Sequence, residues 1–110
     1  MESASAKPIA STRSEDPAFE ERIDRFVVGL GERIDALQDA ESAGDRRALG
    51  ALAEAFALES RELGYPSLAD AAAQLAEASA DEGLETLRKS VVDLTELSQR
   101  VRRGHRSAAS

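Results

Sequence analysis

Apolar residues recur along this chain every three or four positions, which is the spacing of one face of an α-helix. Asp16 and Pro17 precede the first run, as a helix-capping residue and a first-turn proline do. The pattern predicts one helix over residues 17–42, with Gly29 and Gly31 inside it at a cost of up to about 1 kcal/mol each. Either a closely packed neighbour compensates for these glycines or a long helix tolerates them. The apolar positions of this run are Ile23, Phe26, Val27, Leu30, Ile34 and Leu37.

A second run predicts a helix over residues 46–63. Asp45 is placed to cap it, Gly64 fits the left-handed position after its end, and Pro66 does not continue it. Its inward positions are Leu49, Leu52, Phe56 and Leu63. Glu54 lies about 200° around the helix from two of these residues, so its carboxylate should face solvent. The residues that share its face are Arg47, Gly50, Ala51, Ala57, Leu58 and Arg61.

Two further helices are expected in the second half of the chain. The sequence from Ser67 to Asp70 has the form of a capping box and predicts a helix over residues 68–80 with an alanine-rich inner face. The next helix should cover residues 82–103 and close at Gly104. Its inward positions are Leu84, Leu87, Val91, Leu94 and Val101, a seam that Ser98 interrupts.

Four amphipathic helices joined by short loops bury their apolar faces most simply against one another. We therefore predict an all-α fold, an up-down-up-down four-helix bundle. The bundle should span residues 16–104, between a disordered N-terminal arm over residues 1–15 and a disordered tail over residues 105–110. The single histidine, His105, falls in that tail and is interpreted as an ordinary tail residue.

Composition limits the classes of function. The 110 residues suit one domain, and 14 basic against 21 acidic residues give a net charge of −7, which argues against nucleic acid and an anionic membrane as partners. There is no cysteine, no apolar run long enough to span a bilayer and no signal-peptide core. We expect a cytoplasmic protein with no cofactor and no metal site, because carboxylates at helical spacing, such as Glu59 and Glu62, usually form solvated faces.

The order of these features from Phe26 to Gly104 resembles the histidine-containing phosphotransfer (HPt) domain of bacterial phosphorelays. The matching pieces are FVVGLGERIDALQDA, the Gly44-Asp45 turn, and LAEAFALESRELGYPSLADAAAQL. On this alignment Ala53, Phe56 and Gly64 match the family's preceding alanine, core position and helix-ending glycine. The resemblance implies a four-helix bundle whose partner is the receiver domain of a response regulator or hybrid kinase.

The chain departs from the family at its reactive residues. The phosphoacceptor histidine falls on Glu54, the family's lysine on Ala57 and its glycine on Leu58. A carboxylate is a far weaker nucleophile than an imidazole, and an alanine supplies no cation to a phosphoryl group. We therefore expect a non-enzymatic, pseudo-phosphotransfer domain that docks a receiver without accepting phosphate. The expected contact residues are Glu54, Gly50, Ala51, Ala57, Leu58 and Arg61, although Glu54 also fits a plain solvated surface acid.

Two other classes of function remain open. A helper phosphatase for receiver aspartyl-phosphates would use an acid and an amide on one helix, for which Asp70 with Gln74 and Glu96 with Gln99 have suitable spacing. A structural or oligomerising module would use apolar residues that do not all fit one core. These residues are Val28, Leu58, Val92 and Leu97. The sequence leaves the oligomeric state open.

Overall fold

The computed structural model describes residues 8–81 and 83–109, and within them every regular element is an α-helix. The predicted all-α class is therefore confirmed. Residues 1–7 of the expected arm, residue 82 at the expected start of the last helix, and residue 110 lie outside the described residues. The helices are α1 (Pro17–Val28), α2 (Leu30–Ser42), α3 (Arg46–Glu62), α4 (Pro66–Asp81) and α5 (Leu84–Ala109).

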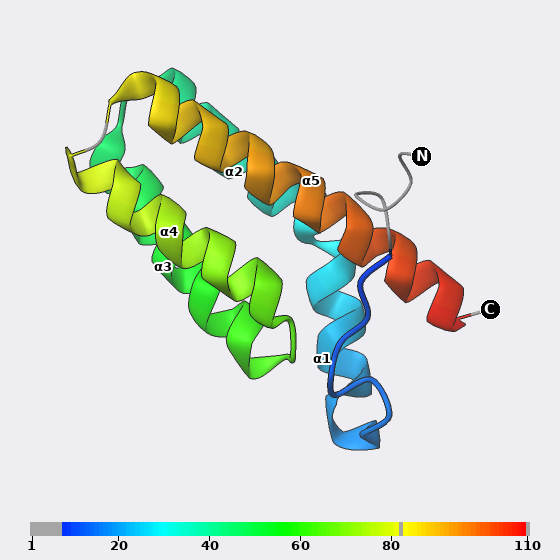
Figure 1. The fold of residues 1–110 in the computed structure, drawn as a ribbon. Helices are drawn as coiled ribbons and strands as arrows, with labels where there is room; N and C mark the ends of the chain where they lie inside the picture. The colour runs from blue at the N-terminus through cyan, green and yellow to red at the C-terminus, as the bar shows by residue number, and fades with distance from the viewer. Residues whose placement is uncertain (1–7, 82, 110) are drawn as a thin grey trace.

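Helices α2 to α5 run lengthwise beside one another, and α1 is turned away from their common direction (Figure 1). α2 contacts α3 and α5, and α4 contacts the same two helices. α1 contacts α2 and α5, so it covers one end of the group formed by the other four. The two short connections, at Gly44 and Gly64, both place their glycine at positive φ, +72° and +87°. The left-handed conformation predicted for Gly64 is thus confirmed.

The prediction of one continuous helix over residues 17–42 was wrong. The chain breaks at Gly29, whose φ and ψ are −86° and 1°, and whose N–H donates to the carbonyl of Arg25 over 3.1 Å. A glycine loses more conformational freedom in a helix than any other residue, so a bend here costs little. The bend lets α1 turn Phe26 across the end of the bundle rather than along α2.

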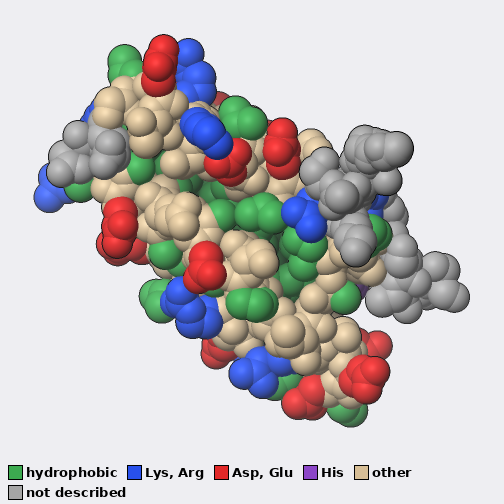
Figure 2. Space-filling model, viewed as in Figure 1, with side chains coloured by type: hydrophobic (Ala, Val, Ile, Leu, Met, Phe, Trp, Pro, Cys, Tyr) green, Lys and Arg blue, Asp and Glu red, His purple; other side chains and the backbone are tan. Residues whose placement is uncertain are grey.

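The core is one contiguous apolar cluster to which all five helices contribute. Its aromatic centre is Phe26, whose ring centroid lies 5.9 Å from that of Phe56 and 5.8 Å from that of Tyr65. Figure 2 shows hydrophobic side chains along the seam between α5 and the α3–α4 pair, with charged side chains on the flanks. Burial raises the pKa of Tyr65 to about 12, because a phenolate in this apolar setting is poorly solvated.

Residues 8–15, expected as part of a disordered arm, pack along the bundle in the structure. The Ile9 amide donates to the carbonyl of Arg100 over 3.0 Å, and the Thr12 amide donates to that of Gly64 over 2.8 Å. The buried Ser11 hydroxyl donates to the carbonyl of Leu63. We call residues 8–15 the strap, because they tie the C-terminal half of α5 to the turn between α3 and α4.

The strap explains why α5 differs from the expected helix over residues 82–103. Gly104 was predicted to close this helix, but it lies inside α5, which continues to Ala109. A Cβ atom at Gly104 would overlap the backbone of Ile9, so the glycine allows the strap to cross the helix. His105, expected as a tail residue, therefore lies on α5, with its Nε2 atom 3.0 Å from Oδ1 of Asp24 on α1.

α4 begins two residues earlier than predicted. Pro66 occupies the first helical position and the carbonyl of Tyr65 accepts from the Ala69 amide over 2.9 Å. Proline suits this position because its missing N–H has no partner inside a helix. The capping box read from Ser67 to Asp70 is therefore inside the helix.

Candidate docking surface on α3 and α4

Glu54 lies in the middle of α3 with its side chain exposed, as the helical spacing predicted. The buried face of α3, however, is shifted around the helix axis relative to the predicted one. Leu52, expected in the core, is 39% exposed, and Ala57, expected on the outer face, is only 5% exposed. The buried side of α3 is formed by Leu49, Ala53, Phe56, Ala57 and Ser60.

The close approach of α4 accounts for this rotation. A Cβ atom at Gly50 would lie 2.7 Å from the Ser79 hydroxyl oxygen, so the two helices touch where α3 has no side chain. Ala53 and Ala72 are fully buried on the two helices. Small residues permit this short separation, and α4 consequently covers the alanine side of α3 while Leu52 moves toward the edge.

A shallow groove of about 370 Å³ remains on the outside of this helix pair. Its α3 side is formed by Glu54, Ala57 and Leu58. Its α4 side is formed by Ala73, Ala76 and Glu77. The alanine methyl groups therefore form the floor of the groove. Glu54 of α3 and Glu77 of α4 each place a carboxylate at its rim. Leu58 is 67% exposed beside Glu54, which is a large apolar side chain left in water at the groove.

The structure brings together only some of the predicted contact residues on one open face. Ala51, Glu54, Leu58 and Arg61 are exposed. Gly50 and Ala57 face α4, so neither extends outward as an expected contact residue would. We call the four exposed residues together with Ala73, Ala76 and Glu77 the α3–α4 surface. The sequence analysis missed the residues that α4 contributes, because the helical periodicity of α3 does not show which helix lies beside it. The run of alanines in α4 was the feature of the sequence that could have indicated this neighbour.

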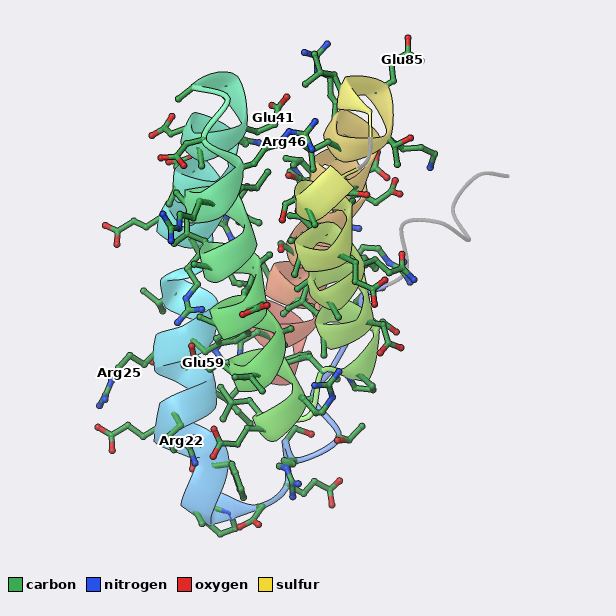
Figure 3. All side chains as sticks on the ribbon, turned by 90° about the vertical axis from the view of Figure 1, so that its left-hand side faces the viewer. Arg22, Arg25, Glu41, Arg46, Glu59 and Glu85 are labelled. Carbon is green, nitrogen blue, oxygen red and sulfur yellow. The ribbon has the colours of Figure 1, made fainter. Side chains whose placement is uncertain are left out.

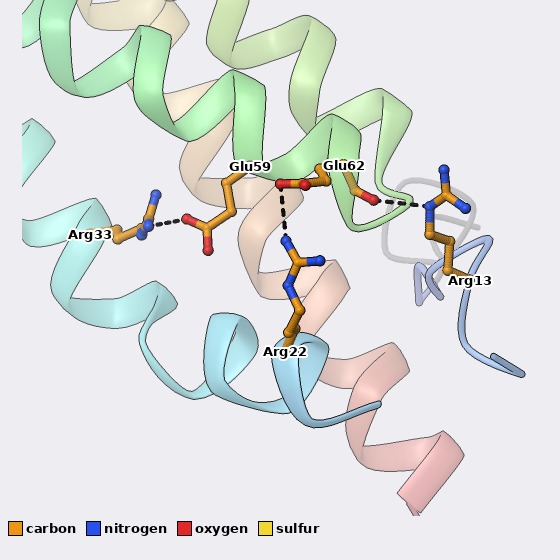
Figure 4. A network of polar contacts seen from close by, with 5 residues as sticks. All are labelled: Arg13, Arg22, Arg33, Glu59 and Glu62. Carbon is orange, nitrogen blue, oxygen red and sulfur yellow. Dashed lines mark hydrogen bonds and ion pairs between the residues drawn. The ribbon is translucent and has the colours of Figure 1, made fainter. Parts of the chain in front are cut away.

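A polar network holds the C-terminal half of α3 against α1, α2 and the strap (Figure 4). Arg33 of α2 pairs with Glu59, and its guanidinium lies 5.6 Å and 5.5 Å from the ring centroids of Phe26 and Phe56. Arg22 pairs with Glu62 at 3.0 Å. Figure 3 shows Arg22 and Glu59 between α1 and α3. Glu59 and Glu62 therefore each pair with an arginine, and they hold a flank of α3 that lies outside the α3–α4 surface.

Of the residues proposed for the other two functions, Leu58 belongs to the α3–α4 surface, and the others lie on α1, α4 and α5. Asp70 and Gln74 are exposed on α4, and Glu96 and Gln99 are exposed on α5. The leftover apolar residues Val28 and Val92 are exposed on α1 and α5, whereas Leu97 packs against the core.

Comparison with known proteins identifies no relative: the chain matches no family model, no curated protein and no solved structure. Within residues 8–81 and 83–109, no cluster of three or more His, Asp or Glu side chains has a geometry suited to a metal ion. No helix among the described residues combines the length and the apolar composition of a bilayer span.

Proposed function

We propose that this chain is a degenerate HPt-like domain, which docks the receiver domain of a phosphorelay protein on its α3–α4 surface and does not accept phosphate. The observation that carries the proposal is the environment of Glu54. The residue at the acceptor position of the resembled family is exposed in mid-helix, at the rim of an alanine-floored groove and next to the exposed Leu58. Small residues around an exposed leucine permit the close approach of another protein surface.

The arrangement of the helices supports the same proposal. The mutual contacts of α2, α3, α4 and α5 suit the up-down-up-down four-helix bundle of the resembled family, with α1 as an addition at one end. A cytoplasmic location follows from that role, because receiver domains act inside the cell.

The absence of phosphate transfer follows from chemistry at the site. Glu54 offers a carboxylate, which is a weak nucleophile toward an aspartyl-phosphate. Ala57 is buried and Leu58 is uncharged, so neither provides a cation to a phosphoryl group. A second carboxylate, Glu77, lines the same groove and would repel the phosphoryl oxygens. The chain's one histidine, His105, lies on α5 with its Nε2 atom 3.0 Å from Oδ1 of Asp24 on α1, so it is not part of the α3–α4 surface.

The experiment is a two-part assay with receiver domains encoded in the same genome. An NMR titration of the ¹⁵N-labelled chain with each receiver should shift the amides of Ala51, Glu54, Leu58 and Glu77 with at least one of them. Incubation with that receiver in its phosphorylated form should transfer no label to the chain. Shifts confined to other helices, self-association through Leu58 with no receiver binding, or stable labelling of the chain would each contradict the proposal.

A further inference from the structure

The exposed side of α3 carries an acid, a leucine and a base in line. Glu54, Leu58 and Arg61 are spaced four and three residues apart, so they lie on one side of the helix. All three are exposed, and Leu58 is 67% exposed. Among the residues that the structure describes, neither Glu54 nor Arg61 forms an ion pair. An unpaired charge of each sign therefore flanks an apolar side chain that stands in water.

The groove beside this line is suited to an arginine. Its floor is alanine and its rim carries the carboxylates of Glu54 and Glu77, and within the described part of the chain Glu77 also forms no ion pair. An arginine stem packs on methyl groups while its guanidinium pairs with carboxylates. Arg61 does not line its own groove, because it lies about 10 Å along α3 from Glu54. The α3–α4 surface thus carries both a cation and an acidic groove that the same cation does not fill.

We propose that two copies of this chain associate through their α3–α4 surfaces, with the two α3 helices antiparallel. A two-fold axis that crosses the interface midway between Glu54 and Arg61 places each Arg61 opposite Glu54 of the second copy, and does so twice. Glu77 of the second copy lines the same groove, and the two Leu58 side chains meet at the axis. A parallel pair of α3 helices would instead place Glu54 opposite Glu54, where the two charges repel each other.

Arg47 shows why the axis passes beside Leu58. It is exposed on the same side of α3, seven residues before Glu54, and it too forms no ion pair among the described residues. An axis midway between Arg47 and Glu54 would also match opposite charges. Its centre, however, would hold Gly50 and Ala51, which offer almost no apolar area to bury. Leu58 therefore selects the register.

The contact between the copies is small, since one leucine and one arginine from each copy supply most of it. We expect a dissociation constant of about 0.1–1 mM, which is typical of a transient contact. The dimer covers Glu54 and Leu58, so a second copy and a receiver exclude each other. This exclusion rests on the proposed function, whereas the self-association does not. A receiver that binds the chain should lower the fraction of dimer, and a receiver bound to an intact dimer would overturn the exclusion.

The test is sedimentation velocity of the full chain without a receiver. In about 0.15 M salt, the repulsion between two chains of net charge −7 is screened beyond about 8 Å. The average mass should rise from monomer toward dimer between about 0.02 and 1 mM. Arg61→Glu places two carboxylates opposite each other at both contacts and should weaken the dimer at least about tenfold. Arg47→Glu makes the same change of charge on the same side of α3 and should leave the dimer unchanged.

Reversal of both charges distinguishes a specific contact from general attraction. Glu54→Arg combined with Arg61→Glu in one chain restores opposite charges at both contacts, so this double variant should dimerise about as strongly as the original chain. The proposal is overturned by a chain that stays monomeric at every concentration, by equal effects of Arg47→Glu and Arg61→Glu, or by a double variant as weak as Arg61→Glu alone. Because no receiver is present, each of these results leaves the proposed docking of a receiver unaffected.

Discussion

Replacing Gly104 with alanine should release the strap from α5. The added Cβ overlaps the backbone of Ile9, which is a segment of main chain rather than the end of a flexible side chain. The backbone of α5 is held by its own hydrogen bonds, so the strap has to move. The displacement should break the hydrogen bond from the Ile9 amide to the carbonyl of Arg100.

The size of the effect follows from the contacts of the strap. Release removes the bonds of Ile9, Ser11 and Thr12 to the bundle, which at about 1 kcal/mol each contribute about 3 kcal/mol. Alanine in a helix interior returns about 1 kcal/mol relative to glycine. Gly104→Ala should therefore lower the free energy of unfolding by about 2 kcal/mol.

The assay is urea denaturation followed by circular dichroism, together with hydrogen exchange at the Ile9 and Thr12 amides. Both amides should lose their protection in Gly104→Ala. The matched control is Gly31→Ala on α2, where a Cβ meets only Arg102 Nη1 at an ordinary 3.9 Å, and which should gain up to about 1 kcal/mol. A Gly104→Ala protein as stable as the original chain, with both amides still protected, would refute this reasoning.

Three further predictions concern the core and the helix contacts. The pKa of Tyr65 is raised above its unfolded value of about 10, so its contribution to stability should be constant below pH 10 and then fall by about 1.4 kcal/mol per pH unit up to about pH 12. Tyr65→Phe should lack this loss in parallel denaturation curves. A double-mutant cycle of Arg33→Met and Glu59→Gln should give a coupling of about 1 kcal/mol that shrinks in 1 M salt, and a coupling near zero would mean that the pair does not hold α2 on α3. Gly50→Ala should bring no gain in stability in thermal denaturation, because the contact of its Cβ with the Ser79 hydroxyl offsets the roughly 1 kcal/mol that alanine contributes inside a helix, and a gain of about 1 kcal/mol would contradict the close α3–α4 contact.

The sequence predicted the helical class and the positions of most helix ends, because caps, prolines and glycines act locally. Asp16 and Asp45 cap α1 and α3 as expected, each accepting a hydrogen bond from a first-turn amide. The exposure of Glu54 was also predicted, since it depends only on helical spacing. What failed depended on contacts between segments distant in the chain.

Two glycines show this limit most clearly. Gly104 has the local form of a helix terminator, and only the path of Ile9 shows that it is a crossing point instead. Gly29 was expected inside a continuous helix, but the chain bends there, and Phe26 of α1 stacks on Tyr65 in the turn between α3 and α4, a contact between distant segments. The burial of Ala57 in place of Leu52 likewise depends on α4. Hydrophobicity alone favours leucine over alanine at a buried position, but the short separation between α3 and α4 favours alanine.

The most direct test of receiver docking on the α3–α4 surface is a pair of leucine substitutions. Leu58 and Leu84 are exposed to nearly the same extent, 67% and 63%, but Leu84 begins α5 and lies outside this surface. In calorimetric titrations with a receiver domain that binds the chain, Leu58→Ala should weaken the affinity about tenfold, since a leucine buried at an interface contributes about 1.5–3 kcal/mol, and Leu84→Ala should leave it unchanged. Equal affinities for the two variants, or a larger loss with Leu84→Ala, would contradict docking at this surface.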